Sequence, residues 1–182
     1  MDRSKVEFLN MKLSHMMLPI TATNSKITEI YAKWLEAENG FELFTATIAN
    51  DFGKVHRHEL YAEIVLTLTQ LESISYSLGG KANEKYTRAF NKYGCAELMS
   101  SIKQYFSISD DEQLGKCLTD LRAEIAHVGK PVKHLKNISF PELYGIAKCI
   151  GIVIASHIYQ KLGIGKREIE KFQMQQCRHL PT

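Results

Sequence analysis

The chain lacks the patterns that build β-sheets: its 182 residues contain no clear run of alternating apolar and polar residues and no hairpin turn signal. It also lacks a Gly-rich phosphate loop and a pair of carboxylates placed to hold a metal. The four cysteines, at positions 95, 117, 149 and 177, form no C-x-x-C pair and have no His at zinc-ligand spacing. We therefore predict reduced, buried thiols and expect neither a metal nor a cofactor.

An excess of charge of one sign is missing too, since 23 Lys and Arg oppose 20 Asp and Glu. This weak positive balance is compatible with a nucleic-acid partner but does not indicate one. The most apolar run, residues 146–158, is interrupted by Lys148 and His157 and is shorter than a bilayer span. Residues 1–24 contain no signal-peptide apolar core. We expect a cytoplasmic protein without a membrane segment.

What the sequence does contain is apolar residues at helical spacing, which predicts an all-α fold. Residues 1–24 have no clear period, and we interpret them as a leader or the tail of an absent upstream domain. Residues 25–182 are expected to form one helical domain. Its expected helices cover residues 25–38, 41–51, 58–78, 83–93, 96–106, 109 to the Gly129-Lys130-Pro131 stop, 139–162 and 166–177.

Two of these helices begin with a capping-box pattern, in which a Ser caps the third amide and a Glu three residues later reaches back. The pattern places Ser109 before one helix and Ser139 before another. The helix after Ser139 is apolar almost all round, so we expect it at the centre of the bundle, with His157 as a hydrogen-bonded core residue. Four aromatic side chains at helical spacing are expected in the core: Tyr31, Trp34, Phe41 and Phe44.

The end of the helix after Ser109 carries an Arg and a His with four residues between them, Arg122 and His127. RNA brings its own nucleophile, the 2′-hydroxyl, so a ribonuclease needs no metal-activated water. It needs a group that moves protons near neutral pH, which a His supplies, and a fixed cation for the charge on the phosphorus centre, which an Arg supplies. The pair is therefore a candidate RNA-cleaving site.

The spacing alone arises readily by chance, and its geometry imposes a condition. On an ideal helix, five residues rotate His127 by about 140° from Arg122. The two side chains can meet only if the helix ends near Ala126 or if a second molecule brings its own pair alongside. The alternative is a solvated Arg and a last-turn His that the helix dipole favours.

The segment Leu121-Arg122-Ala123-Glu124-Ile125-Ala126-His127-Val128-Gly129 resembles the LRN-x-IAH-x-G signature of HEPN domains, above all the ApeA-like group. Two weaker likenesses accompany it. The segment 70–73, which includes Glu72, resembles that group's "qaLE" motif, and the segment 159–164 resembles its closing "LGI". At the level of helix order the resemblance covers residues 27–164.

The resemblance implies a helical bundle that forms a homodimer, so that two Arg/His motifs share one cleft. Such domains are commonly metal-independent endoribonucleases of antiviral or toxin systems. By position, Arg122 would hold the scissile phosphate and His127 would act as general acid or base. Glu72 matches a family position and would support the site, and the alternative for it is a solvated or helix-pairing Glu. Ala123 departs from the family, where a polar residue, often Asn, is usual. A non-catalytic HEPN-type module for dimerisation or RNA binding, serving an absent N-terminal domain, therefore stays open.

A basic segment follows His127. Its members are Lys130, Lys133, His134 and Lys136. Because cations neutralise phosphates, this segment is a candidate RNA-backbone contact next to the Arg/His pair. The alternative is a solvated loop. The expected partners are thus RNA and a second copy of the chain.

Overall fold

The computed structural model describes residues 26–36, 57–127 and 133–181, and every regular element among them is a helix. This confirms the all-α prediction for the described part of the chain. The expected leader at 1–24 and the expected helix at 41–51 lie outside it. The observed elements are α3 (Ile27–Leu35), α5 (Arg57–Ser77), the 3-10 turn η2 (Ala82–Glu84), α6 (Thr87–Tyr93), α7 (Ala96–Tyr105), α8 (Asp111–Ala126), α9 (His134–Asn137), α10 (Phe140–Lys161) and α11 (Lys166–Cys177).

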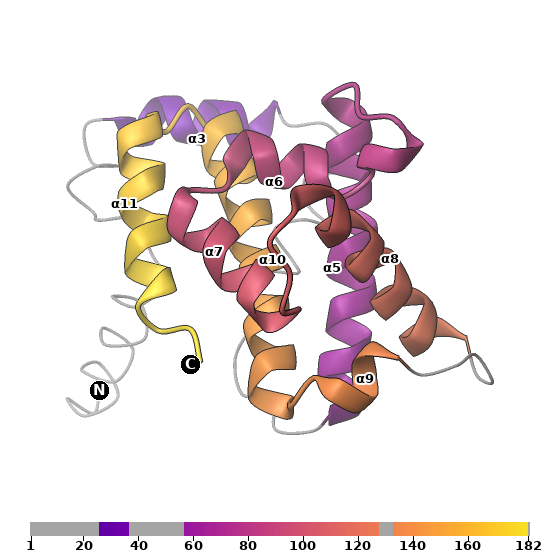
Figure 1. The fold of residues 1–182 in the computed structure, drawn as a ribbon. Coiled ribbons are helices and arrows are strands. Elements are labelled where there is room, and N and C mark those ends of the chain that lie inside the picture. Colours follow the sequence, from indigo (N-terminus) through magenta and orange to yellow (C-terminus); the bar gives the residue numbers. More distant parts are fainter. Residues whose placement is uncertain (1–25, 37–56, 128–132, 182) are drawn as a thin grey trace, which may run out of the picture.

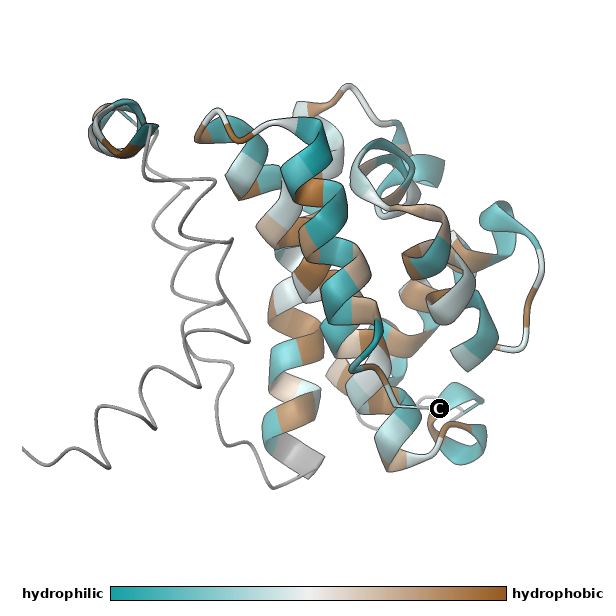
Figure 2. Ribbon diagram, turned by 90° about the vertical axis from the view of Figure 1, so that its left-hand side faces the viewer, coloured by the Kyte–Doolittle hydropathy of each residue, from teal (hydrophilic) through white to brown (hydrophobic). Residues whose placement is uncertain are grey.

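Helix α10 forms the axis of the bundle, as its composition predicted (Figure 1). It packs most extensively against α5 and also contacts α6, α7 and α11. From Leu143 to Ile158 every residue is buried except Tyr144, Lys148 and Gly151. Hydrophobic residues accordingly concentrate in the middle of the bundle, whereas outward helix faces are hydrophilic (Figure 2). Its length and composition would suit a membrane span, but 72% of its most apolar window is buried inside the protein.

The start of α10 also confirms the local signal that predicted it. The Ser139 hydroxyl accepts from the Glu142 amide at 3.4 Å, and the Glu142 carboxylate accepts from the Ser139 amide at 2.7 Å. These two bonds satisfy amides that have no partner within a helix. At its other end, Gly163 adopts the left-handed conformation, with φ of +83°, that a helix C-terminus favours.

The second predicted capping box is wrong. Helix α8 is capped by Asp110, not Ser109, and the Asp110 carboxylate accepts from the Glu112 amide at 3.0 Å. A carboxylate beside the positive end of the helix dipole is a stronger acceptor than a hydroxyl, which accounts for the difference. The expected single helix over 83–93 is also divided, into η2 and α6, around the fully buried Tyr86.

One buried polar residue joins three elements of the bundle. Gln173 of α11 donates to the Tyr93 carbonyl and the Ser156 hydroxyl and accepts from the Cys95 amide at 2.9 Å. Its side chain is 1% exposed. These three hydrogen bonds satisfy the buried side-chain amide of Gln173. They also fix the position of α11 against α10 and the α6–α7 junction.

Two further predictions about the core are confirmed and one is wrong. His157 is 5% exposed and its Nδ1 lies 2.9 Å from the Tyr93 hydroxyl. All four cysteines are free; Cys117 and Cys149 are buried as expected, whereas Cys95 and Cys177 are only partly buried. Tyr31, by contrast, is 63% exposed on α3, although a core position was expected. The Trp34 side chain and the residues Phe41 and Phe44 lie outside the described part.

Candidate functional site

Arg122 lies on the face of α8 that packs against α5. Leu114, Leu118 and Leu121 form the buried stripe of α8, and this stripe fixes the helix rotation. The Arg122 guanidinium consequently meets α5, where Nη1 lies 3.4 Å from Oε2 of Glu72. Its Nη2 donates to the Thr69 hydroxyl at 3.3 Å.

Glu72 lies between two cations. Its Oε2 faces Arg122, and its Oε1 lies 4.0 Å from the Lys85 Nζ. All three side chains are between 22% and 33% exposed, so they are partly shielded from water. The carboxylate therefore orients the guanidinium, while the cluster keeps one net positive charge. Glu72, Arg122 and Lys85 come from three separate segments, and the pairing of Glu72 with Arg122 spans 50 residues of sequence.

His127 is the C-cap of α8 and is exposed. Its backbone is extended, with φ of −123° and ψ of 105°, and its amide donates to the Ala123 carbonyl at 3.1 Å. The helix thus ends at Ala126, the place where the sequence required an end if the two side chains are to approach. Because the His127 amide still bonds within α8, the His127 Cα keeps its helical position and only the torsions from its own φ onward depart from the helix. His127 therefore stays well around α8 from Arg122, and the approach of an imidazole to the guanidinium requires a second copy of the chain.

The two residues after Arg122 have different roles in the structure. Ala123 is half-buried and contributes only its carbonyl to the His127 cap. Glu124 holds the start of α9: its carboxylate accepts from the His134 amide at 2.9 and 3.0 Å and from the Leu135 amide at 3.0 Å. Burial alone would raise the pKa of Glu124, but these amides lower it below its ordinary value.

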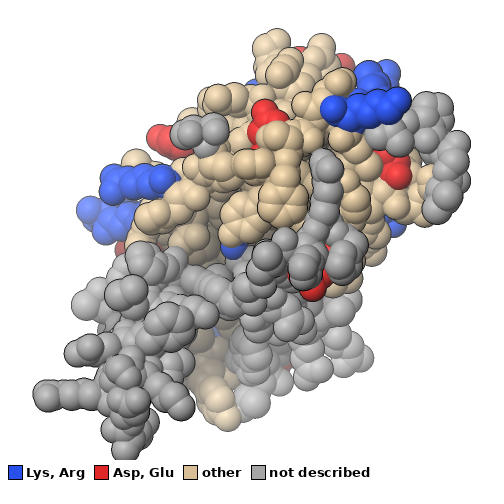
Figure 3. Space-filling model, turned by 90° about the horizontal axis from the view of Figure 1, so that it is seen from below, with Lys and Arg blue, Asp and Glu red and all other residues tan. Residues whose placement is uncertain are grey.

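The basic segment is only partly a solvated loop. Lys130 lies outside the described residues, and Lys133 and Lys136 are exposed. His134 instead turns inward: its ring meets the Phe106 ring edge-on at 5.8 Å, and its Nε2 lies 3.8 Å from Asp120. The segment also folds into the single turn α9, which was not predicted. Seen from below, Lys and Arg gather at two edges of the molecule, and the surface between them carries Asp and Glu among uncharged residues (Figure 3).

An uncharged exposed face of α5 was also missed by the sequence analysis. It consists of Ala62, Leu66, Thr69, Ser73 and Tyr76, at helical spacings of three and four residues. Leu66 is 43% exposed and Tyr76 is 50% exposed. Because Arg122 donates to Thr69, the candidate site borders the middle of this exposed α5 face.

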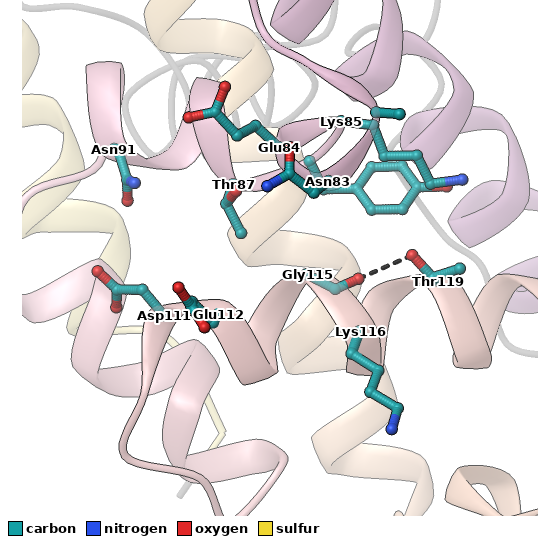
Figure 4. A pocket seen from close by; sticks show the side chains of 12 residues that line it. Asn83, Glu84, Lys85, Thr87, Asn91, Asp111, Glu112, Gly115, Lys116 and Thr119 are labelled. Atoms are coloured by element: carbon teal, nitrogen blue, oxygen red, sulfur yellow. Dashed lines mark hydrogen bonds between the residues drawn. The ribbon is translucent and has the colours of Figure 1, made fainter.

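Two pockets of about 550 Å³ flank α8. The first separates residues 82–91 from α8, and in it Thr87 points across the gap toward the Gly115–Thr119 turn of α8 (Figure 4). Its lining includes three carboxylates, those of Glu84, Asp111 and Glu112, against two lysines. That balance does not suit a polyanion such as RNA.

The second pocket lies between the end of α7, α8, α9 and the start of α10. We call it the His134 pocket, after one of its lining residues. Its lining also includes Phe106, Cys117, Asp120 and Lys133. It is reached from the same side of α8 as α9, and Arg122 is not part of its lining.

Within the described ranges, no group of three or more His, Cys, Asp or Glu could hold a metal ion. No protein-family model, curated protein or solved structure matches the chain. The functional conclusion therefore depends on the geometry of the site and on the resemblance of its motif.

Proposed function

We propose that this protein is a metal-independent endoribonuclease that acts as a homodimer, with Arg122 and His127 as its catalytic residues. One observation carries the proposal: an oriented guanidinium and an exposed imidazole occupy the last turn and the cap of the same helix. The resemblance of this segment to the HEPN signature supports the same activity. It also supports a role in antiviral defence or a toxin system in the cytoplasm.

The proposed reaction uses the 2′-hydroxyl of RNA as nucleophile. One His127 imidazole accepts the proton of that hydroxyl while the oxygen attacks the adjacent phosphorus. The bond from phosphorus to the 5′-oxygen breaks, and the His127 of the second copy gives a proton to this leaving oxygen. Arg122 stabilises the negative charge on the phosphoryl oxygens. The products are a 2′,3′-cyclic phosphate and a 5′-hydroxyl.

The exposed α5 face is the proposed dimer interface. It carries no charge, it includes two large apolar side chains, and Arg122 contacts its central residue Thr69. A two-fold axis passing near Thr69 would therefore bring the two Arg122 side chains to the same groove. Two copies would also supply the two imidazoles that the proton transfers require.

The catalytic test is RNA cleavage in EDTA by the parent chain, Arg122→Ala and His127→Ala. We expect His127→Ala to lower the cleavage rate by about 10²–10⁴-fold, the usual contribution of a general acid or base, and Arg122→Ala to lower it by about 10²–10³-fold, the usual loss when a charge-stabilising donor is removed. Arg88→Ala is the matched control, since Arg88 is an exposed arginine that pairs only loosely with Glu84, at 3.8 Å. Metal-free cleavage that survives both site substitutions would remove this mechanism.

The dimer is tested separately by sedimentation equilibrium of Leu66→Glu and Tyr76→Glu. Each substitution places a carboxylate in the apolar interface on both subunits. It should therefore weaken dimerisation and lower the cleavage rate by a similar factor. Met174→Glu is the control, because Met174 is similarly exposed, at 45%, but lies on α11. If the α5 variants remain dimeric, the proposed interface is wrong.

A second candidate function is a non-catalytic module for dimerisation or RNA binding. The ion pair of Arg122 with Glu72 favours it, because a guanidinium neutralised within its own chain is less available to a phosphate. Ala123 in place of a polar residue favours it as well. This alternative gives a stable dimer that binds RNA without turnover at any pH.

A further inference from the structure

The His134 pocket contains a buried polar atom without a partner. The Nε2 of His134 makes no hydrogen bond, and the His134 side chain is 12% exposed. The nearest charged group is Asp120, whose Oδ2 lies 3.8 Å away, beyond hydrogen-bond distance. The carboxylate favours the tautomer that carries the proton on Nε2. His134 and Asp120 both line the pocket, but Nε2 itself has less than 1 Å² of accessible surface. A ligand hydroxyl that accepts from Nε2 and donates to Asp120 therefore requires the His134 ring to turn toward the pocket.

Two exposed lysines stand at the rim of the same pocket, Lys116 and Lys133. Figure 4 shows Lys116 pointing away from residues 83–87, the opposite wall of the acidic pocket. Burial and the Asp120 charge raise the pKa of the Cys117 thiol, whereas the charges of Lys133 and Lys116 oppose this rise. The two lysines line the pocket together with Cys117 and Asp120, and they provide a place for an anionic group.

The remaining walls are partly aromatic, and several of their side chains are held by contacts within the chain. Phe106 presents its ring beside His134, and Tyr105 is fixed by a hydrogen bond of 2.6 Å to the Pro181 carbonyl. The other carboxylate of the lining, Glu142, is engaged with the Ser139 amide at 2.7 Å. Glu124 holds the backbone of His134 in place. A cavity of about 550 Å³ with such walls is in the size range of small-molecule sites.

We propose that the His134 pocket binds one ribonucleotide, with its phosphate at Lys116 and Lys133, a ribose hydroxyl between His134 and Asp120, and its base beside Phe106. Two ligands carry these groups: a free mononucleotide, and one nucleotide of an RNA chain. The second of these rests on the proposed function. Asp120 precedes His127 by seven residues, about 10 Å along the helix and nearly the same direction around it. An RNA nucleotide in this pocket would therefore lie on the His127 side of α8, beside the proposed cleavage point, and would select the base there.

Binding is measured by isothermal titration calorimetry in EDTA, with adenosine 5′-monophosphate as the probe and His127→Ala as the parent protein. His127 does not line the pocket, so this parent binds the nucleotide without cutting RNA. We expect Lys133→Ala and Asp120→Asn each to weaken binding by about tenfold, because each removes a charged partner. Lys171→Ala is the matched control, since Lys171 is an exposed lysine of α11 that does not line the pocket, and it should change binding by less than twofold. Circular dichroism of each variant verifies that it is folded.

Two further ligands separate a nucleotide site from a simple anion site. The 2′,3′-dideoxy analogue lacks the hydroxyl that joins His134 to Asp120 and should bind about tenfold more weakly. Inorganic phosphate should bind more weakly than the nucleotide by at least that factor. Equal binding of phosphate and nucleotide, no saturable nucleotide binding, or equal losses in Lys133→Ala and Lys171→Ala would each overturn the proposal.

A single-stranded RNA octamer distinguishes these two ligands and separates this proposal from the proposed function. RNA binding that Lys133→Ala weakens and the mononucleotide displaces supports a nucleotide of the chain. Nucleotide binding that RNA does not displace supports a free mononucleotide. Cleavage by the His127-containing chain without any nucleotide binding overturns the pocket and leaves the nuclease intact. Nucleotide binding that depends on Lys133, without cleavage, supports the pocket and overturns the nuclease.

Discussion

Glu124 allows a quantitative test of how the chain holds the segment after the Arg/His motif. The perturbation is Glu124→Gln, which keeps the shape of the side chain but removes its charge. Three contacts to the amides of His134 and Leu135, all between 2.9 and 3.0 Å, then lose a charged acceptor. Hydrogen bonds to charged groups contribute roughly 1.5–3 kcal/mol, and the half-buried position places Glu124 toward the lower part of that range. A neutral amide oxygen retains part of the interaction, so we expect a loss of about 1–2 kcal/mol at pH 7.

The loss of stability in Glu124→Gln should also depend on pH, and the pKa shift of Glu124 gives the direction. The amides hold the folded-state pKa of Glu124 below its ordinary value of 4.5 despite the opposing effect of burial. A carboxyl with a lowered pKa contributes stability that is present above the unfolded-state pKa and is lost as the pH falls through the folded-state pKa. The difference between the parent chain and Glu124→Gln should therefore be full at pH 7 and shrink once the pH falls below about 4.5.

The assay is urea unfolding followed by far-ultraviolet circular dichroism at pH 7 and at pH 3.5. Glu170→Gln is the control, because Glu170 is an exposed helical glutamate that pairs with the exposed Lys166 at 3.6 Å. That substitution should change the free energy of unfolding by a few tenths of a kcal/mol. If Glu124→Gln behaves like the control at pH 7, or if its effect does not change with pH, the assigned role of the carboxylate is refuted.

Three other predictions concern the fold. Ser107 ends α7 with a left-handed φ of +53°, so Ser107→Gly should raise the free energy of unfolding in urea by about 1 kcal/mol; no change would mean that the residue is unstrained. On α10, a methyl group at Gly145 would overlap the Tyr105 ring, whereas one at Gly151 would meet nothing within 4 Å. Gly145→Ala should therefore destabilise the protein by roughly 1–3 kcal/mol and Gly151→Ala should stabilise it by roughly 0.5–1 kcal/mol, in the same urea assay; the opposite order would contradict the packing. Burial lowers the pKa of His157 to about 4, so the stability contributed by its neutral form is complete above pH 6.5 and is lost as the pH falls toward 4. Its imidazole signals in NMR titrations should show this midpoint, and a midpoint near 6.5 would contradict it.

The sequence predicted well those features that depend on neighbours within a few residues. The Ser139–Glu142 box, the apolar α10 and its Gly163 stop are all local patterns, and the structure confirms them. The start of α8 was misassigned by one residue because Ser109 and Asp110 are both good caps, and only the backbone geometry decides between them. Boundaries of this kind are less certain than the existence of the helix.

The candidate site could be predicted only as the pair Arg122 and His127, with Glu72 added by the resemblance, and the structure does bring Glu72 to Arg122. The sequence placed Arg122 and His127 at a helix end, but it could not show that Thr69 and Lys85 join Glu72 around the guanidinium, since these contacts cross from one helix to another. It also treated the basic segment as a loop. The turn α9 forms where the Glu124 carboxylate, ten residues earlier in the chain, accepts a hydrogen bond from the His134 amide. No local sequence pattern predicts that contact.

Gln173 has a practical consequence for how the domain can be shortened. A truncation that ends before α11 removes the one side chain that satisfies the Tyr93 carbonyl, the Cys95 amide and the Ser156 hydroxyl together. Water would have to enter beside α10 to replace it, and the apolar residues Ile169 and Phe172 would no longer cover that helix. The packing of α10 and of the α6–α7 junction therefore depends on α11. Fragments intended for expression or for fusion to other proteins should extend past residue 177.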